Sequence, residues 1–537
     1  MCIQPAPATE QANDPTAMDK TAQSKQADVP VAVTLASNRR VLRLIDFRLL
    51  PILWTVYCLQ FLDKMTLSYA AVFGLIEDTN LVGDQFSWLA SIVYVAQLVF
   101  QPIVAYSLVR FPIGKFISVM VLCWGSMLCV MTAAKDFGGL MATRLLLGVF
   151  EASANADEDG LAAPTFIAVV QMWYRRREQT LRNASWYSML GVINMLGSLL
   201  AYGLGHINPQ SLKSYQVIFL FLVASVVKKR SKDYFIDNPS IFMPDSPMKA
   251  KFLKGDDKLI AIERLRMNQM GIGSGVWKWD HVRECALDPK TWLWFILMFV
   301  ISLTVDQSIP SGGISTFGPL IIESFGFDRF TTILFNIPFG AVQMVVTLGG
   351  AWLSDRIRMK SPVLVLLSLL PVAGCVVLIA TGRDPADRAV LLTGYYIISV
   401  YPGISPLVYS WSGQNTGGDT KRKVTTGMLF VGASAGNMVG PLLFRPSEAP
   451  RYDRGLRANL GLFVALAVLV GLGMLLIKML NRRQAARRLS MADDRGKSRD
   501  KDEGTDDDVL NMAEENVGDR GLDDVTDLKN EDFIFVY

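Results

Sequence analysis

Two ionisable residues stand side by side inside an otherwise apolar stretch of this sequence. Asp63 and Lys64 lie in the run from Leu49 to Phe73. Adjacent residues on a helix point about 100° apart, so the two side chains cannot face the same neighbour. A lysine can extend its long stem toward an interface, whereas the short side chain of Asp63 cannot. Ionisable groups at membrane depth usually face a cavity or a partner.

A second apolar run carries an arginine and an acid on one helical face. Arg144, Gly148 and Glu151 follow the spacing i, i+4, i+7. Arginine offers a planar fork to a carboxylate. A carboxylate in a low dielectric has a raised pKa and can exchange a proton near neutral pH. These residue types therefore suit an anion that is moved together with a proton.

A third apolar run contains Asp306 and Gln307 about fourteen residues after its start near Trp292, the same depth at which Asp63 occurs in its own run. We interpret the acids as symmetry-related. All six residues form a candidate substrate and proton pathway: Asp63, Lys64, Arg144, Glu151, Asp306 and Gln307. The alternative interpretation is a set of structural ion pairs between helices.

Composition predicts an all-α, polytopic membrane protein. The chain has 537 residues, of which 51% are hydrophobic and 19% charged. Charged residues gather at the ends and in short clusters, and the apolar runs between them are about the 20 residues that a helix needs to cross a bilayer. With two histidines and no cysteines at metal-binding spacing, we expect no metal site, no cofactor and no catalytic residues. We also expect no nucleic-acid partner.

About twelve spans divide six and six around a long polar segment. They start near Leu49, Gln85, Lys115, Gly139, Asn183, Ser214, Trp292, Phe330, Pro362, Ala389, Met428 and Leu460. The predicted units are a disordered tail (1–45), a first half (46–227), a central cytoplasmic loop (228–290), a second half (291–480) and a disordered charged tail (481–537). The central loop contains an amphipathic stretch, DKLIAIERLRMNQMG, that favours a helix lying on the cytoplasmic face.

Lysine and arginine in the short loops predict that both termini are cytoplasmic. The clusters at 110–115, 175–182, 356–360 and 421–423 would then lie inside. The segment RPSEAPRYDRGLR before the last span does not fit, because it would place four arginines outside.

A short repeat connects the two halves. NMLGSLL (194–200) and NMVGPLL (437–443) agree at five of seven positions and fall in the fifth span of each half. Polar residues beside small ones are typical of helix packing in membranes. We therefore expect packing roles for Asn194, Gly197, Asn437, Gly440 and Pro441.

Several sequence words together resemble the major facilitator superfamily, and within it the fungal allantoate permease family. They are LQFLDK (59–64), LVGDQFSWLASIVY (81–94), GLMATRLLLGVFEA (139–152), MWYRRREQ (172–179), MPDSP (243–247), DPKTW (288–292), IPSGGISTFGPLIIESFGF (309–327), WLSDR (352–356) and APRY (449–452). The resemblance implies two six-helix bundles around a cavity lined by the first, fourth, seventh and tenth helices, a location in the plasma membrane and a monomer.

The superfamily's loop motif G-x-x-x-D-R-x-G-R-K is degenerate in this chain. The first copy retains Arg110, Gly114 and Lys115 but has no aspartate, and the second retains Asp355 and Arg356. By resemblance, Asp355 pairs with helix ends on the cytoplasmic side and stabilises one state of the transport cycle. Ordinary loop charge is the alternative.

Two departures interrupt the family pattern. ANADEDGLA (154–162) breaks the fourth span, and KKRSKDYFIDNPS (228–240) truncates the sixth. Three acids facing hydrocarbon would each cost about 2.5–3.5 kcal/mol. We hypothesise gene-model errors such as retained introns, which transcript sequencing tests; if both stretches occur in mature message, the activity of the chain is in question.

The functional expectation is proton-coupled uptake of a small organic anion. The resemblance suggests allantoate or another ureide, a vitamin such as nicotinate or pantothenate, or a small peptide. A drug/proton antiporter is one alternative, although SMLGVINMLGSLL lacks the proline of that class's G-x-x-x-G-P-x-x-G-G pattern. A nutrient sensor on the same fold and a membrane-embedded acyltransferase are others; signalling without uptake would indicate the sensor, and an acyl-transfer assay would indicate the enzyme.

Overall fold

The computed structural model describes most of the helical part of the chain. The described residues are 34–72, 79, 85–110, 119–120, 123–124, 126–127, 130–131, 134, 136–154, 163–205, 247, 250, 252–253, 255–266, 277–305, 334–382, 385–439, 453–499, 524–530 and 533–537. At several helical positions, which include 59–72, 151–154 and 491–499, the backbone alone is described.

Helices account for nearly all of the described backbone, and these residues contain no strand. The first half consists of α2 (Leu35–Val72), α4 (Gln85–Arg110), α6 (Phe137–Ala154), α7 (Ala163–Trp173), α8 (Arg176–Tyr187) and α9 (Met189–Gly205). Between the halves lie α11 (Asp256–Arg266) and α12 (Trp279–Leu287). The second half consists of α13 (Pro289–Val305), α16 (Asn336–Ile357), α17 (Ser361–Ala380), η3 (Pro385–Asp387), α18 (Arg388–Ile398), η4 (Tyr401–Gly403), α19 (Ile404–Gln414), α20 (Asp419–Val439) and α21 (Asp453–Arg499).

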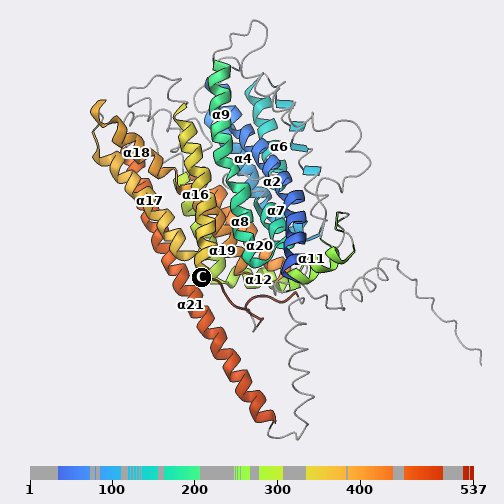
Figure 1. Cartoon of the computed structure of the whole chain (residues 1–537). Helices are drawn as coiled ribbons and strands as arrows, with labels where there is room; N and C mark the ends of the chain where they lie inside the picture. The colour runs from blue at the N-terminus through green and yellow to red at the C-terminus, as the bar shows by residue number, and fades with distance from the viewer. Residues whose placement is uncertain are drawn as a thin grey trace, which may run out of the picture.

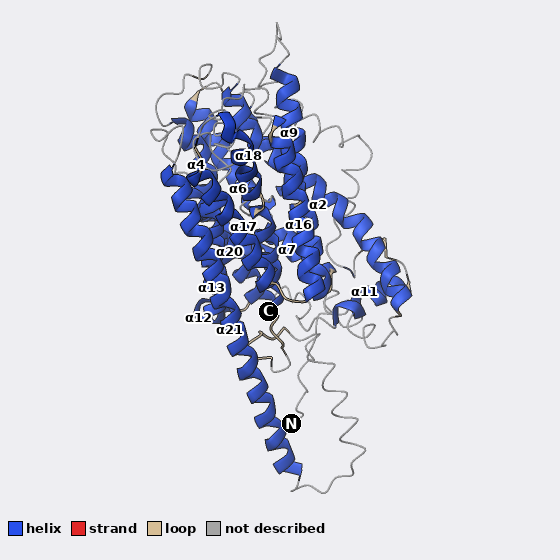
Figure 2. Cartoon of the chain, turned by 60° about the vertical axis from the view of Figure 1, so that its left-hand side comes forward, coloured by secondary structure: helices blue, strands red, loops and turns tan. Residues whose placement is uncertain are grey.

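The long helices run side by side in one bundle, and α21 projects beyond it (Figures 1 and 2). Within the first half α4 packs on α6 and α2 on α9; within the second, α13 packs on α20 and α17 on α21. The halves meet where α9 packs on α16, α4 on α20, and α8 on α16 and α19. We call the end of the bundle where α8 and α20 begin and α19 ends the basic end, because Arg175, Arg176, Arg177, Lys360 and Lys421 gather there.

Length and apolar composition qualify four helices in the described part of the chain to cross a bilayer. They are Asn336–Ile357, Ser361–Ala380, Arg388–Gln414 and Arg454–Ser490. A fifth candidate is the pair Trp279–Leu287 and Pro289–Thr304, which is bent by 68°. The predicted span that starts near Ser214 lies outside the described residues.

Several predicted boundaries need correction. The N-terminal tail was expected to be disordered to residue 45, but α2 begins at Leu35. The tail from 481 was also expected to be disordered, but α21 continues to Arg499 and residues 524–530 and 533–537 pack against the basic end. The central segment is partly helical, and α11 coincides with the predicted amphipathic stretch. The interruption of the fourth span falls between α6 and α7, where 155–162 are not described.

The central helix α11 is fixed to the first half by a buried arginine. The guanidinium of Arg264, whose side chain is 1% exposed, donates to both carboxylate oxygens of Glu178 at 2.8 Å. Its Nε also donates to the Asn38 side chain at 2.5 Å. Glu178 in turn accepts the backbone N–H of Arg175 at 3.1 Å. Such an acceptor satisfies an N–H that is free at a helix start, so α8 begins at Arg176.

The two halves approach closely where α9 crosses α16. A Cβ built on Gly191 would lie 2.2 Å from the carbonyl oxygen of Gly340, and one built on Gly340 would lie 2.5 Å from the carbonyl oxygen of Gly191. Both distances are far below van der Waals contact, so only glycine permits this crossing. Small residues that bring backbones together are the usual basis of helix association in membranes.

Candidate functional site

Arg144 lies in α6 and is 4% exposed. Its Nε and Nη2 atoms have no hydrogen-bond partner within the part of the chain that the structure describes. Burying a guanidinium is costly unless it is paired and hydrogen-bonded. Arg144 therefore retains N–H groups that could donate hydrogen bonds to an anion.

The face that Arg144 shares with Gly148 and Glu151 is in contact with α4. A Cβ built on Gly148 would lie 2.7 Å from the carbonyl oxygen of Val93 and 2.9 Å from the Cβ of Ala96. At the level of Gly148 this face therefore packs against a helix and does not line an open space. Only the backbone of Glu151 is described.

Most other members of the predicted pathway are not placed by their side chains. Asp63 and Lys64 lie in α2, where the backbone alone is described, while Asp306 and Gln307 lie outside the described residues. The juxtaposition of Asp63 and Arg144, and the symmetry between the two acids, stay predictions.

The second copy of the loop motif reaches across the halves. Asp355, near the end of α16, hydrogen-bonds with Thr180 of α8, and the charges of Lys360 and Arg182 act on it. Arg356 is exposed. In the first copy the backbone of Arg110 ends α4, and Gly114 and Lys115 fall outside the described residues.

Asn194 pairs across the halves with a glutamine that the sequence analysis did not single out. Its Nδ2 donates to Oε1 of Gln343 in α16 at 2.6 Å, and Gln343 Nε2 lies 3.4 Å from the Tyr401 hydroxyl. Asn194 and Gln343 are 5% and 1% exposed. Gly197 is also buried in α9. The asparagine therefore holds α9 against α16 with a buried amide pair.

The repeat places the same residue types on the other interface between the halves. Gln97 in α4 precedes Arg110 by the same thirteen residues that separate Gln343 from Arg356. Both Gln97 and Asn437 are 1% exposed, on α4 and α20, which pack together. The side-chain amide of Asn437 has no hydrogen-bond partner among the described residues. Gly440 and Pro441 lie outside them.

At the basic end, polar and aromatic contacts close the two halves against each other. Asn183 Nδ2 of α8 donates to the Ser410 hydroxyl of α19 at 3.0 Å. Trp186 stacks on Tyr409 with ring centroids 6.4 Å apart and planes inclined by 13°. Arg176 donates to the backbone oxygen of Gln414, and the Gln414 amide donates to the backbone oxygen of Arg176. This structure is therefore shut at the basic end.

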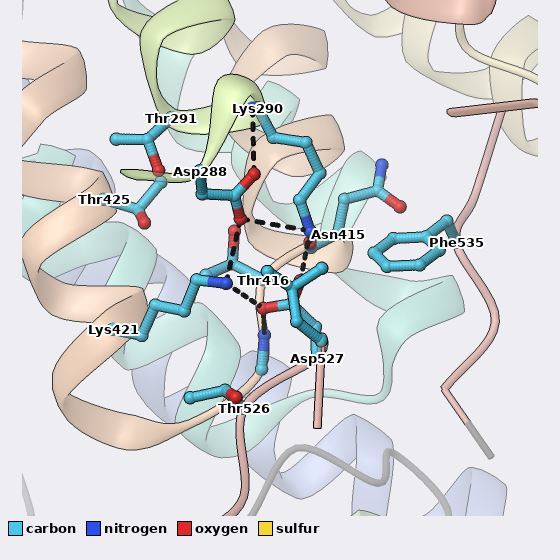
Figure 3. Close-up of polar contacts among 12 residues, drawn as sticks. Asp288, Lys290, Thr291, Asn415, Thr416, Lys421, Thr425, Thr526, Asp527 and Phe535 are labelled. Atoms are coloured by element: carbon cyan, nitrogen blue, oxygen red, sulfur yellow. Dashed lines mark hydrogen bonds and ion pairs between the residues drawn. The ribbon is translucent and has the colours of Figure 1, made fainter. Parts of the chain in front are cut away.

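A buried ion network lies beside these contacts (Figure 3). Asp527, which is 0% exposed, accepts from Lys421 Nζ at 2.9 Å and forms an ion pair with Lys290. Lys421 also contacts Asp288 and Glu284, each at 2.9 Å. Lys290 Nζ lies 3.5 Å from Asp288 and 4.3 Å from the centroid of the Phe535 ring. Two lysines therefore face three carboxylates, one of which comes from the C-terminal segment.

Sequence reasoning missed this network. The sequence analysis places Lys290 at the end of the central cytoplasmic loop and Lys421 in a basic cytoplasmic loop, and it gives neither lysine a partner. One feature of the sequence could have indicated that the C-terminal residues pack against the bundle: FIFVY (533–537) is an apolar run that follows an acidic one. Among the described residues, no group of three or more histidine, cysteine, aspartate or glutamate side chains could hold a metal ion.

Comparison with known proteins agrees with this architecture. The Major Facilitator Superfamily matches residues 53–441. An uncharacterized transporter of Schizosaccharomyces pombe is 33% identical over 444 residues, which are 80% of each chain. The thiamine pathway transporter of Saccharomyces cerevisiae is 30% identical, covering 81% of this chain and 78% of that one. The allantoate permease of the same yeast is 29% identical, covering 87% and 83%.

A solved structure supports the fold. The crystal structure of a bacterial homologue of the iron transporter ferroportin, in its outward-facing state, superposes with a TM-score of 0.55 at 13% sequence identity. The match covers 79% of this chain and 98% of that one. From the sequence match, the relatives and the helical bundle together, the chain belongs to the Major Facilitator Superfamily of membrane transporters, alongside fungal relatives that include allantoate permease.

Proposed function

We propose that this transporter takes up a small organic anion together with a proton. The observation that carries the proposal is Arg144, a buried arginine with two guanidinium nitrogens that have no partner among the described residues. A guanidinium in this setting binds a carboxylate through charge-assisted hydrogen bonds. The similarity to an allantoate permease supports an anionic substrate.

The substrate class follows from this chemistry. A carboxylate occupies the guanidinium fork, and ureido or amide groups on the same molecule use neighbouring polar side chains. Allantoate and related ureides come first, followed by nicotinate, pantothenate and small peptides. Thiamine, a cation, distinguishes an anion transporter from a cation transporter, and it is included because a relative of similar identity is named a thiamine pathway transporter.

Proton coupling is assigned to the acids of the candidate pathway, Asp63, Glu151 and Asp306. A carboxylate in an apolar setting takes up a proton more readily than one in water. Protonation on one side and release on the other would make the movement of the anion depend on the proton gradient. We assign the basic end to the cytoplasm, since loops rich in lysine and arginine stay inside. Both termini then lie in the cytoplasm, and we expect a monomer in the plasma membrane.

The test is uptake by a permease-deficient yeast that expresses the chain. Labelled allantoate, nicotinate, pantothenate, a dipeptide and thiamine are compared with and without a protonophore. We expect uptake of at least one anion and its loss when the gradient collapses. Uptake of thiamine alone, or uptake that ignores the gradient, would contradict the proposal.

Variants of Arg144 link that uptake to the site. Hydrogen bonds to charged groups contribute about 1.5–3 kcal/mol, so Arg144→Ala should reduce uptake at low substrate concentration at least about tenfold. Arg144→Lys retains the charge without the fork and should fall between Arg144→Ala and wild type. Arg457→Ala, an exposed arginine of α21, is the matched control. Equal uptake by Arg144→Ala and Arg457→Ala at matched expression would show that Arg144 does not bind the substrate.

A further inference from the structure

The C-terminal segment, which we define as the described residues 524–530 and 533–537, lies across the basic end of the bundle (Figures 1 and 3). Its side chains are buried at intervals: Thr526, Asp527 and Phe533 are 0% exposed, and Phe535 is 1% exposed. A tail that merely rested on the surface would leave its aromatic side chains in water. The segment therefore occupies a formed site.

Two asparagines recognise the backbone of the segment in the same way. Asn415 Nδ2 donates to the carbonyl oxygen of Val536 at 2.9 Å, and Asn415 Oδ1 accepts the N–H of Val536 at 2.7 Å. Asn481 repeats this arrangement with Phe535, at 2.9 and 3.0 Å. Each side-chain amide thus satisfies both backbone groups of one residue. Reciprocal pairing of this kind fixes the register of a bound peptide.

Further contacts fix the end of the segment. Trp411 Nε1 donates to the carbonyl oxygen of Val536 at 2.9 Å, and the N–H of Lys360 donates to the carbonyl oxygen of Tyr537 at 2.6 Å. Residues of α19 and α21, together with the residue that precedes α17, therefore all hold this peptide.

Two buried lysines bind the carboxylate of Asp527 in the segment. Asp527 lies between Lys290 and Lys421, which are 2% and 0% exposed. Two carboxylates of the bundle, Glu284 and Asp288, also face these lysines. Without Asp527 the remaining two lysines and two acids balance, so the bundle could exist with the segment released. A buried carboxylate that is added to a balanced cluster must gain from both lysines to stay bound.

The segment also joins the two halves. Among the described residues, its other polar partners lie in α12, at Lys278 just before it and in the second half, but Arg176 at the start of α8 belongs to the first half. The Arg176 guanidinium lies 4.5 Å from the centroid of the Phe533 ring, and its Nη2 lies 3.4 Å from the carbonyl oxygen of Ile534. The same side chain contacts Gln414 of α19. Separation of α8 from α19 would therefore pull Arg176 away from the segment.

We propose that the basic end carries a peptide-binding site whose ligand is this chain's own C-terminal segment, and that the bound segment locks the two halves together there. Opening at the basic end requires α8 and α19 to part, as alternating access demands when the halves rock against each other. The bound segment opposes that movement and acts as a built-in brake on it. This inference depends on the fold and not on the identity of the substrate.

The first experiment measures binding of the segment. A cleavage site for a specific protease replaces residues 508–514 in the purified full chain, and mass spectrometry quantifies the fragment that remains bound after cutting. We expect retention in the otherwise unchanged protein. Asp527→Asn should weaken retention at least about thirtyfold, because it removes one partner of a buried charge pair. Lys529→Gln, which changes an exposed charge in the same segment, is the matched control and should retain the fragment.

The second experiment measures locking. Ser410, 1% exposed in the contact between α8 and α19, is replaced by cysteine, and its labelling by a maleimide is followed in native membranes. The same chain without the Ser410→Cys change supplies the background from native thiols. We expect deletion of 524–537 to raise the labelling rate about tenfold or more, and a synthetic peptide of residues 524–537 to reverse the increase.

The outcomes separate this inference from the transport proposal. Immediate loss of the cut fragment from the unchanged chain, or equal retention of the Asp527→Asn and Lys529→Gln fragments, would overturn the binding site. Retention together with unchanged labelling after deletion would overturn the lock. Neither measurement uses a transported substrate, so failure of the uptake assay leaves both results interpretable.

Discussion

The crossing of α9 and α16 at Gly191 and Gly340 makes the sharpest stability prediction. A methyl group at Gly191 would be 2.2 Å from the Gly340 carbonyl oxygen and 2.8 Å from the backbone nitrogen of Met344. The first distance is about 1.2 Å shorter than the 3.4 Å at which ordinary contact begins. The obstructing atoms belong to the main chain, so a side-chain rotation cannot relieve the overlap, and the helices must separate.

The expected magnitude combines two opposing effects. Overpacking of a well-packed contact typically costs about 1–3 kcal/mol. Because the atoms that the new methyl group would meet belong to the rigid backbone of α16, we expect Gly191→Ala to cost about 3 kcal/mol, at the upper end of this range. Replacing glycine by alanine within a helix gains roughly 1 kcal/mol. The net expectation is a loss of about 2 kcal/mol. Gly203→Ala in the same helix has nothing within 4 Å of its Cβ, so it retains the gain without the clash.

The assay is thermal unfolding of the detergent-purified variants, followed by the loss of monodisperse protein. Gly191→Ala should unfold at least about 3 °C below Gly203→Ala. Gly340→Ala, whose Cβ would lie 2.5 Å from the Gly191 carbonyl oxygen, should behave like Gly191→Ala. Equal midpoints for Gly191→Ala and Gly203→Ala would show that the halves do not cross this closely, and would refute the reasoning.

Three further predictions follow from buried polar contacts. Arg264→Met removes the guanidinium that pairs with Glu178 and should cost about 3–5 kcal/mol, seen as a lower midpoint of thermal unfolding; a midpoint equal to wild type would show that this ion pair does not hold α11. Asn194→Ala should lower the free energy of unfolding by about 1–3 kcal/mol. In a double-mutant cycle with Gln343→Ala the two losses should not add, whereas strict additivity would show that the two side chains do not interact. Burial alone would raise the pKa of Asp527, but the two lysines outweigh it and lower the pKa below its usual value. Because the pKa of bound Asp527 is lowered, its carboxylate stabilises the bound segment fully at any pH above the ordinary aspartate pKa near 3.9. This stabilisation is lost as the pH falls below that value. Fragment retention should therefore stay constant from about pH 8 to pH 5 and decline only below about pH 4; release with a midpoint near pH 6 would contradict it.

The helical class and the family could be predicted from the sequence because both depend on local composition. Apolar runs of membrane length indicated the helices, and a set of short sequence words in a fixed order indicated the superfamily. The small neighbours of Asn194 predict a packing role, but they do not identify the residue that its side chain contacts, Gln343, which lies 149 residues away. A single polar residue within an apolar run does not reveal which of several helices it will meet.

The ordered C-terminal segment could not be predicted by the same means. Its composition is acidic, and a charge-rich run without a companion surface is correctly interpreted as unstructured. The companion surface consists of Lys290, Asn415 and Lys421, at the ends of three helices, and Asn481, within α21. Lys290 and Asp527 are 237 residues apart. The packing of the second-half helices brings these groups together, and no periodicity in the sequence reveals it.

The helix that precedes the segment has a consequence for how strongly the segment must bind. α21 runs about 27 Å beyond Asn481 before it ends at Arg499, and only twenty-four further residues, 500–523, separate Arg499 from Asp524. A tether of this length confines the peptide near its site at an effective concentration on the order of millimolar. An intrinsic affinity of merely tens of micromolar would thus suffice for near-complete occupancy. A cellular protein that competes for the same surface would have to match that local concentration, so changes to the tether itself would alter the occupancy without touching a single contact.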